Sequence, residues 1–330
     1  MPWATSSSTP RPKLFPDPVG TVLLKFSGHF WGKPEAAADP SRNSSTKILR
    51  PLLGQTRGGS RAFEECLPCR FGEGSDGEST VICHVVPYTV ASGPANMAFD
   101  EALLEIVSAG GSQVYFRTYG WLEPTLSLGY FQPSRLVRED PRWRGICWVR
   151  RSSGGGAILH DRELTYALAV PAGHPRAVLP QALYRVVHEA IGEVLRGWGV
   201  EARRRAVVPA DGRSLPGPRP FLCFADRDPE DLVVGTVKVV GSAQRKRSAG
   251  ILQHGSLLLR HSVITPELPG VADLAEVPDD PQQWSRVVTE AVVAALGMHA
   301  RPAEPDPAIE TLAERLERTR FGHDSWTYRR

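Results

Sequence analysis

Apolar residues recur at helical spacing in some parts of the chain and alternate with polar residues in others. Between residues 180 and 198 they fall on one face of a long helix, which Gly199 ends. That face carries Leu183, Val186, Val187, Ala190, Ile191, Val194 and Leu195. Ser92-Gly93-Pro94 and Gly110-Gly111 mark the start and the end of an earlier helix. This helix is predicted to bury Met97, Leu103, Leu104 and Val107.

Short apolar segments bounded by turn residues predict strands around these helices. The segments are 113–119, 125–131, 146–150 and 164–170. Residues 231–234 and 237–240, joined at Gly235-Thr236, predict a two-residue hairpin. Helices mixed with antiparallel strands indicate an α+β domain, in which helices flank a mixed, largely antiparallel sheet.

The two ends of the chain differ from the middle. Residues 1–80 are rich in Ser, Pro, Gly and Arg and have no sustained period, which predicts a mostly disordered leader or sequence upstream of the functional start. The folded domain is expected over residues 85–330. Its last part, from about residue 280, has helical patterns over 283–296 and 308–318 with a Pro-rich break at 301–307 between them.

Composition and charge exclude several classes of function. The formal net charge is only +3, and no apolar run is long enough to cross a bilayer, so neither nucleic-acid binding nor membrane insertion is expected. Five cysteines are an odd number in a long chain, which argues against a disulfide framework and favours the cytoplasm. Cys66 and Cys69 have the spacing of a redox pair or of half a zinc site. No second pair completes such a site, so chance spacing is the favoured interpretation and no metal is expected.

Two basic clusters are exceptions to this nearly balanced charge. They are Arg203-Arg204-Arg205 and Arg245-Lys246-Arg247. One interpretation is a basic rim that attracts an acidic protein partner. Solvated loop charges explain the first cluster equally well.

The segment from Arg150 to His160 combines two arginines with three consecutive glycines. It reads Arg-Arg-Ser-Ser-Gly-Gly-Gly-Ala-Ile-Leu-His and directly follows a predicted strand. Glycine lets the backbone approach a ligand closely, and arginine offers a planar, charged fork to phosphate or carboxylate oxygens. The pattern predicts a cradle for an anionic or acylated ligand, with an ordinary Gly-rich turn as the alternative.

Four further blocks accompany this segment along the chain. They are Asn-Met-Ala-Phe-Asp-Glu-Ala-Leu-Leu at 96–104, Pro-Thr-Leu-Ser-Leu-Gly-Tyr-Phe-Gln at 124–132, Lys-Val-Val-Gly-Ser-Ala-Gln-Arg at 238–245 and Ile-Leu-Gln-His-Gly-Ser at 251–256. In this order the blocks resemble the catalytic domain shared by lipoate-protein ligases, octanoyltransferases of lipoate synthesis and, more distantly, biotin-protein ligases. The resemblance extends from about Pro87 to the C-terminus. It implies a catalytic domain like that of class II aminoacyl-tRNA synthetases and biotin ligases.

The resemblance also implies which residues contact the acyl substrate. We expect contacts from Arg151, Gly154, Gly155, Gly156, Ala157, Ile158, Leu159, His160, Gly241, Ser242, Ala243 and His254. His160 and His254 either polarise a ligand carbonyl, act as bases or, as neutral rings, tie loops together. Tyr119, Trp121 and Leu128 either line the acyl slot or belong to the core.

Cys223 is the candidate nucleophile. It lies in Arg-Pro-Phe-Leu-Cys-Phe-Ala-Asp at 219–226, and its Cys-Phe pair resembles the acyl-accepting loop of the Gram-positive type of octanoyltransferase. A thiol exchanges acyl groups between thioesters, and a nearby cation makes it a better nucleophile. Lys238, just beyond the predicted hairpin turn, is the candidate cation and the candidate hydrogen-bond donor to the thioester carbonyl. A plain buried cysteine between Phe221 and Phe224 is the alternative.

Two other cysteines of the predicted domain are weaker candidates. Cys147 lies inside an apolar strand and is expected in the core. Cys83 precedes His84, but adjacent residues on a strand point to opposite faces, so we discount a Cys-His pair.

The reaction depends on how the acyl group is activated. A ligase of this family uses ATP to make an acyl-adenylate, whereas an octanoyltransferase takes a thioester from acyl carrier protein. The ligase resemblance implies an Asn-Asp pair before the hairpin, but the run Pro-Glu-Asp-Leu at 229–232 has no Asn. We therefore interpret the chain as an octanoyltransferase. It would act through a Cys223 thioester on a lysine of a lipoyl domain, such as that of the glycine cleavage H protein, without cofactor or metal.

Two other interpretations stay open. An ATP-dependent lipoate-protein ligase would need ATP and Mg²⁺ and would hold the adenylate phosphate with Lys238 and the cradle at 151–159. A catalytically silent family member would bind lipoyl domains or acyl chains without turnover.

Overall fold

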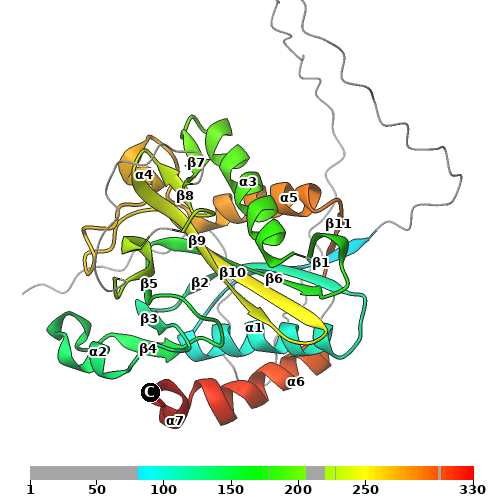
Figure 1. Ribbon diagram of the computed structural model, residues 1–330, viewed down its shortest axis with the longest axis horizontal. Helices are drawn as coiled ribbons and strands as arrows, with labels where there is room; N and C mark the ends of the chain where they lie inside the picture. Colours follow the sequence, from blue (N-terminus) through cyan, green and yellow to red (C-terminus); the bar gives the residue numbers. More distant parts are fainter. Residues whose placement is uncertain (1–80, 178, 206–219, 227, 304–305) are drawn as a thin grey trace, which may run out of the picture. The chain divides into compact units, whose positions relative to one another are not determined.

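A large sheet forms the centre of the part of the chain that this computed structural model describes, namely residues 81–177, 179–205, 220–226, 228–303 and 306–330. Its eight strands are β1 (Ile82–Ala91), β2 (Val114–Trp121), β6 (Glu163–Pro171), β7 (Ala202–Arg204), β8 (Leu232–Val234), β9 (Val237–Lys246), β10 (Gly250–Leu258) and β11 (His299–Pro302). They lie in the order β11-β1-β2-β6-β10-β9-β8-β7 (Figure 1). Neighbours from β2 to β7 are antiparallel, while β1 runs parallel to β2 and β11. The predicted α+β class with a mixed, largely antiparallel sheet is confirmed.

A second, smaller sheet carries the glycine-rich segment. It consists of β3 (Thr125–Leu128), β4 (Cys147–Arg150) and β5 (Ile158–His160), with β3 in the middle. β3 pairs parallel with β4 and antiparallel with β5. Short helices, α2 (Arg135–Glu139) and η1 (Pro141–Trp143), connect β3 to β4. The glycines therefore form the connection between the two outer strands of this sheet.

Helices cover both faces of the large sheet. α1 (Gly93–Ser108) and α6 (Pro307–Leu316) lie on one face, and α3 (Pro180–Gly197) and α5 (Pro281–Ala295) lie on the other (Figure 1). The side chains of β6 alternate between these layers because successive strand residues point to opposite faces. Leu164 and Leu168 belong to the core beneath α3 and α5, whereas Ala167 and Ala169 belong to the core beneath α1. The remaining short helices are α4 (Val271–Leu274), α7 (Asp324–Thr327), η2 (Pro175–Ala177), η4 (Cys223–Ala225) and η5 (Glu317–Phe321).

The first helix has the predicted boundaries and buried face. Ser92 is its N-cap, and the Ser92 hydroxyl accepts a hydrogen bond from the Ala95 amide. Pro94 lies in the first turn, where its missing amide proton costs nothing. The residues predicted to be buried, Met97, Leu103, Leu104 and Val107, are all in the core.

Several strands were not predicted, for identifiable reasons. β10 is buried on both faces and so has no alternation of apolar and polar residues. β11 overlaps the start of the segment predicted as a Pro-rich break, and it pairs at the edge of the sheet, where Pro302 is tolerated. The strand predicted over 125–131 ends at Leu128. The hairpin of β8 and β9 turns at Gly235, whose φ is +58°, as predicted.

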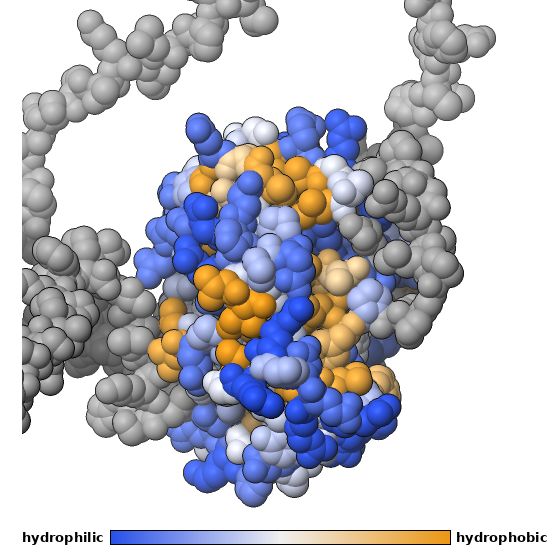
Figure 2. All heavy atoms as spheres, turned by 90° about the vertical axis from the view of Figure 1, so that its left-hand side faces the viewer, coloured by the Kyte–Doolittle hydropathy of each residue, from blue (hydrophilic) through white to orange (hydrophobic). Residues whose placement is uncertain are grey.

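Some expectations concern residues outside the described part of the chain. The leader at 1–80, with Cys66 and Cys69, is among them. Within the described residues, no helix is both long and apolar enough to span a bilayer. Figure 2 shows the side of the molecule on which α2 lies in Figure 1, where apolar side chains form separate groups between polar and charged ones.

A buried carboxylate joins α1 to two strands of the large sheet. Asp100 Oδ2 accepts hydrogen bonds from the Tyr119 hydroxyl at 2.9 Å and from His254 Nδ1 at 3.0 Å. Its Oδ1 lies 3.5 Å from Nη1 of Arg117, another buried side chain. Asn96 Oδ1 accepts a 2.7 Å hydrogen bond from Arg117. The Asn96 amide nitrogen donates to the main-chain carbonyls of Ala91 at the end of β1 and of Gly120 in β2. A buried charge is tolerated because it is paired and hydrogen-bonded.

Asp100→Ala is expected to lower the free energy of unfolding by about 3–5 kcal/mol, because it leaves the Arg117 guanidinium buried without its carboxylate. Urea unfolding followed by circular dichroism measures the change. Glu105→Ala, on the same helix, is the control: its side chain is 27% exposed and pairs with Arg247, so its loss should cost about 0–1 kcal/mol. Equally small losses in both variants would contradict this account of the core.

Candidate active site

The glycine-rich connection approaches the Cys223 loop at van der Waals distance. A Cβ on Gly156 would lie 2.9 Å from the Cys223 amide nitrogen and 3.1 Å from the Phe221 carbonyl oxygen. Gly155 has a φ of +90°, which favours glycine. The Ala157 amide donates to the Phe221 carbonyl at 2.8 Å, and the Cys223 amide donates to the Ala157 carbonyl at 2.7 Å. These two hydrogen bonds fix Cys223 directly beside the glycines.

Both arginines of the segment hold main-chain carbonyls. Arg151 Nη1 donates to the Ser127 carbonyl and hydroxyl at 2.6 Å, and Nη2 donates to the carbonyls of Gly154 and Gly156. Arg150 donates to carbonyls of the 129–132 turn and to that of Thr327. Burial lowers the pKa of Arg151 to about 10, so it stays charged at neutral pH. These guanidinium groups satisfy carbonyls that an irregular backbone leaves unpaired.

Lys238 lies beside the candidate nucleophile. Its Nζ is 3.6 Å from Cys223 Sγ and donates to the Cys223 carbonyl at 3.1 Å. The same nitrogen forms a 2.8 Å ion pair with the buried carboxylate of Asp231. Burial lowers the pKa of Lys238, but the neighbouring Cys223 sulfur and the Asp231 carboxylate outweigh this effect, so the net pKa is raised. Lys238 is therefore a fixed cation next to the thiol.

A cleft of about 950 Å³ opens over this pair. Of the predicted ligand contacts, Gly154, Gly155, Gly156, Ser242 and Ala243 line it together with Cys223 and Lys238. Gly241 lies under the lysine, where a Cβ would be 2.5 Å from Lys238 Cε. The fold thus brings the glycine segment, the cysteine loop and the start of β9 to one place.

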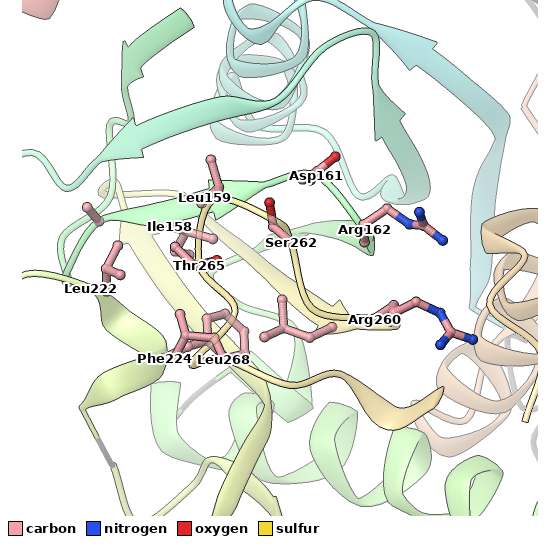
Figure 3. A pocket seen from close by; sticks show the side chains of 12 residues that line it. Ile158, Leu159, Asp161, Arg162, Leu222, Phe224, Arg260, Ser262, Thr265 and Leu268 are labelled. Carbon is pink, nitrogen blue, oxygen red and sulfur yellow. The ribbon is translucent and has the colours of Figure 1, made fainter. Parts of the chain in front are cut away.

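The predicted contacts Ala157, Ile158 and Leu159 line a different and much smaller pocket. Figure 3 shows its apolar end, formed by side chains that include Ile158, Phe224 and Leu268. Arg162 and Arg260 lie at the other end and both bind Asp279. The pocket holds about 20 Å³, enough for about one water molecule. An acyl chain could enter it only if the surrounding side chains moved.

His160 and His254 lie beneath the cradle. His160 Nδ1 donates to Glu163 and its Nε2 accepts from the Ser127 hydroxyl, both at 2.6 Å. His254 Nδ1 donates to Asp100 at 3.0 Å, and its Nε2 lies 2.5 Å from the hydroxyl oxygen of Ser153. Both rings are buried. In this arrangement the two histidines connect strands to the glycine segment, and contact with a ligand stays a prediction for them and for Arg151.

The three residues considered for the acyl slot, Tyr119, Trp121 and Leu128, pack against other residues of the protein. Tyr119 is buried beside Arg117, and Leu128 is buried in the small sheet. Trp121 stacks on His160 with ring centroids 3.9 Å apart. This stacking helps to fix the ring of His160.

Cys83 and Cys147, the other cysteines in the described part of the chain, do not line the cleft. Cys83 is fully buried, and burial raises the pKa of its thiol to about 12, which makes it a poor nucleophile. Cys147 was expected in the core, but its strand lies at an edge of the small sheet, and its side chain is half-buried. Burial also raises the pKa of Cys147.

Several side chains that line the cleft were not singled out from the sequence, among them Tyr184, His188 and Gln132. Tyr184 and His188 come from α3, and Gln132 donates to the Phe221 carbonyl at 3.0 Å. His188 interrupts the apolar face of the predicted helix, which was the available signal. Asp231 belongs to the Pro-Glu-Asp-Leu run at 229–232. Its pairing with Lys238 could not be predicted, because it depends on the register of the hairpin.

The basic clusters are largely paired with carboxylates. Arg204 binds Glu189 and Glu230, and Arg247 binds Glu101 and Glu105. This reduces the net charge that either cluster presents. Among the residues that the structure describes, no group of three or more His, Cys, Asp or Glu side chains could hold a metal ion.

Several known proteins are similar to this chain in sequence or in fold. Residues 92–314 match the sequence profile of the lipoyl protein ligase A/B catalytic domain. Octanoyltransferase LipM of Kyrpidia tusciae is 32% identical over 261 residues, which cover 71% of this chain and 94% of the relative. The LipM of Bacillus subtilis is 32% identical over 268 residues, 73% of this chain and 95% of its own. The LipM of Anoxybacillus flavithermus is 42% identical, but over 60% of its length and 50% of this chain.

Among solved structures, a bi-partite lipoate protein ligase of Thermoplasma acidophilum, described with its E2 lipoyl domain, has a TM-score of 0.57. The match has 18% identity and covers 75% of this chain and 96% of the other. A lipoate-protein ligase A bound with ATP has a TM-score of 0.56 at 20% identity, over 75% of this chain and 97% of the other. At such identities the likeness concerns the fold alone. The profile match and the LipM relatives show that the chain belongs to the lipoyl protein ligase A/B catalytic domain family.

Proposed function

We propose that this chain is an octanoyltransferase of protein lipoylation. It moves an octanoyl group from acyl carrier protein to a lysine of a lipoyl domain, such as that of the glycine cleavage H protein. The names of the LipM relatives support the reaction, and the lipoyl domain named with a structural neighbour supports the acceptor. The observation that carries the proposal is the 3.6 Å contact between Lys238 Nζ and Cys223 Sγ in an open cleft.

In the first half-reaction the Cys223 thiolate attacks the thioester of the donor. The Lys238 ammonium stabilises the thiolate by its charge and donates a hydrogen bond to the oxygen on which negative charge develops. Asp231 keeps the lysine charged and oriented. The acyl–sulfur bond to the carrier breaks, a new one forms to Cys223, and the carrier leaves as a thiolate, which takes from solvent the proton that Cys223 lost when it ionised.

In the second half-reaction the acceptor lysine attacks the Cys223 thioester. A carbon–nitrogen bond forms, the carbon–sulfur bond breaks, and the proton lost from nitrogen ends on the Cys223 sulfur. Thioester to amide transfer is downhill, so the proposed reaction needs neither ATP nor metal. A reaction that depends on a free thiol suits a reducing compartment, and we place it in the cytoplasm.

Incubation with octanoyl-acyl carrier protein without ATP is expected to give an octanoyl adduct that hydroxylamine removes. Intact-protein mass spectrometry measures it. Cys223→Ala should abolish the adduct, because the acyl group then has no sulfur in the cleft. Cys147→Ala is the matched control, since this half-buried thiol lies outside the cleft lining, and it should keep the adduct.

An adduct that persists in Cys223→Ala would overturn the assigned nucleophile. The absence of any adduct in the wild type, together with transfer of free lipoate that requires ATP and Mg²⁺, would identify the chain as a ligase. Saturable binding of lipoyl domains without transfer under either condition would identify a silent family member.

Lys238→Gln is expected to slow formation of the acyl-enzyme by about 10²-fold or more, because it removes the cation and the donor to the developing oxyanion. Stopped reactions analysed by mass give the rate. Because Asp231 would lose its partner, the double variant Lys238→Gln/Asp231→Asn removes the unpaired buried charge and serves as the folding control. An undiminished rate in a folded variant would contradict the role of Lys238.

A further inference from the structure

A chain of hydrogen bonds crosses the floor of the cleft from α3 to β10. His188 on α3 is 1% exposed, and its Nδ1 lies 2.5 Å from the main-chain carbonyl oxygen of Glu230. Its Nε2 lies 2.6 Å from the hydroxyl oxygen of Ser242. Ser242 is half-buried and lines the cleft, as does His188. The two-half-reaction scheme above assigns no task to either side chain.

The partners of His188 fix its tautomer. A carbonyl oxygen only accepts, so Nδ1 carries the proton that is donated to Glu230. Burial, reinforced by the charge of Lys238, lowers the pKa of His188 to about 4, so the ring is neutral at physiological pH. Its Nε2 therefore has a free lone pair and can only accept. The Ser242 hydroxyl must donate its single proton to this nitrogen.

The hydrogen bonds around Tyr166, the other partner of Ser242, agree with a Ser242 hydroxyl that donates to His188. Gln244 donates to Gln253 Oε1 at 2.8 Å, which turns the Gln253 amide nitrogen toward the Tyr166 hydroxyl at 3.0 Å. The Tyr166 hydroxyl lies 2.5 Å from Ser242 Oγ. Because the proton of Ser242 is directed to His188, Tyr166 donates to Ser242. Burial raises the pKa of Tyr166 to about 12, so that proton is present.

Ser242 Oγ is consequently an acceptor without a free proton. One of its two lone pairs binds Tyr166, and the other is left for a donor in the cleft. Lys238, in the same cleft, is a hydrogen-bond donor. Asp231 keeps it a cation, which can donate hydrogen bonds but cannot accept a proton. A ligand between them meets a donor on one side and an acceptor on the other. The acceptor side suits a nitrogen that carries protons.

We propose that Ser242 accepts a hydrogen bond from the N–H of the attacking acceptor lysine, and that His188 is a positioning residue that keeps the Ser242 proton turned away from that nitrogen. This inference rests on the proposed transfer. Holding one N–H on Ser242 directs the amine lone pair toward the thioester carbon while Lys238 holds the carbonyl oxygen. The bonds formed and broken are those of the second half-reaction, and no additional reactant is needed.

The two half-reactions are measured separately to test this. Octanoyl-Cys223 enzyme is prepared with octanoyl-acyl carrier protein, separated from the donor and mixed with excess H-protein lipoyl domain. For Ser242→Ala and His188→Leu, transfer in a single turnover should slow by about 10²-fold, because the amine is no longer held in the attacking geometry. Formation of the acyl-enzyme should keep its wild-type rate, since that step has no attacking amine.

His188→Gln supplies the rescue. A glutamine amide can donate to the Glu230 carbonyl and accept from Ser242, so transfer should recover most of the wild-type rate. Ser285→Ala is the matched control, because it also removes a buried hydroxyl pair, the 2.6 Å contact with Thr118 between α5 and β2, and neither residue lines the cleft. It should change neither half-reaction. Thermal unfolding of each variant verifies that it is folded.

Each other outcome overturns the proposal. Equal slowing of both half-reactions would indicate a structural role only. Slowing of acyl-enzyme formation alone would mean that Ser242 accepts its hydrogen bond from an amide N–H of the donor's pantetheine arm and not from the acceptor lysine. Unchanged rates would mean that Ser242 contacts no reacting group. If the wild-type enzyme forms no octanoyl-Cys223, the proposed function itself fails, and this result is distinct from all the others.

Discussion

The carboxylate of Asp100 contacts Arg117, Tyr119 and His254 inside the protein, and much of the structure depends on this contact. A buried charge must be paired and fully hydrogen-bonded, so α1, β2 and β10 can pack only in the arrangement that brings these groups together. His254 then extends the network to Ser153 in the glycine segment. The position of the cradle is thereby connected to the core rather than to a surface loop.

The second constraint is the close approach of two backbones. Gly156 lets the segment lie against the Cys223 loop, and the amide and carbonyl of Ala157 bind that loop directly. Arg151 has a structural task here, because its donors hold the carbonyls of Gly154 and Gly156. The glycine-rich segment, whose sequence suggested an anion site, therefore supports the loop that carries the Cys223 thiol. The cation that faces this thiol comes from β9 instead.

Two basic side chains line the cleft in different protonation states, since Lys238 is charged and His188 is neutral. Lys238 is charged because the Cys223 sulfur and the Asp231 carboxylate together outweigh the effect of burial on its pKa. His188 is neutral because burial and the nearby lysine disfavour its cationic form, while a carbonyl takes its single N–H. Two titratable groups whose pKa values are shifted in opposite directions can serve different steps of one reaction. The proposed division, in which Lys238 serves the carbonyl oxygen and His188 acts through Ser242, follows from this difference.

Local patterns in the sequence were enough to predict the fold class, the boundaries of α1 and α3 and the hairpin at Gly235, because these depend on periodicity, capping and turn residues. The motifs also singled out Cys223 and Lys238 as candidates. Three contacts became evident in the folded chain alone: Arg151 binds its own backbone, Asp231 pairs with Lys238 and His188 reaches Ser242. These contacts join residues distant in the chain or depend on strand register, and a one-dimensional pattern carries no information about which buried polar groups meet. β10 and β11 escaped prediction for a related reason, since burial on both faces and pairing at a sheet edge are properties of the assembled sheet.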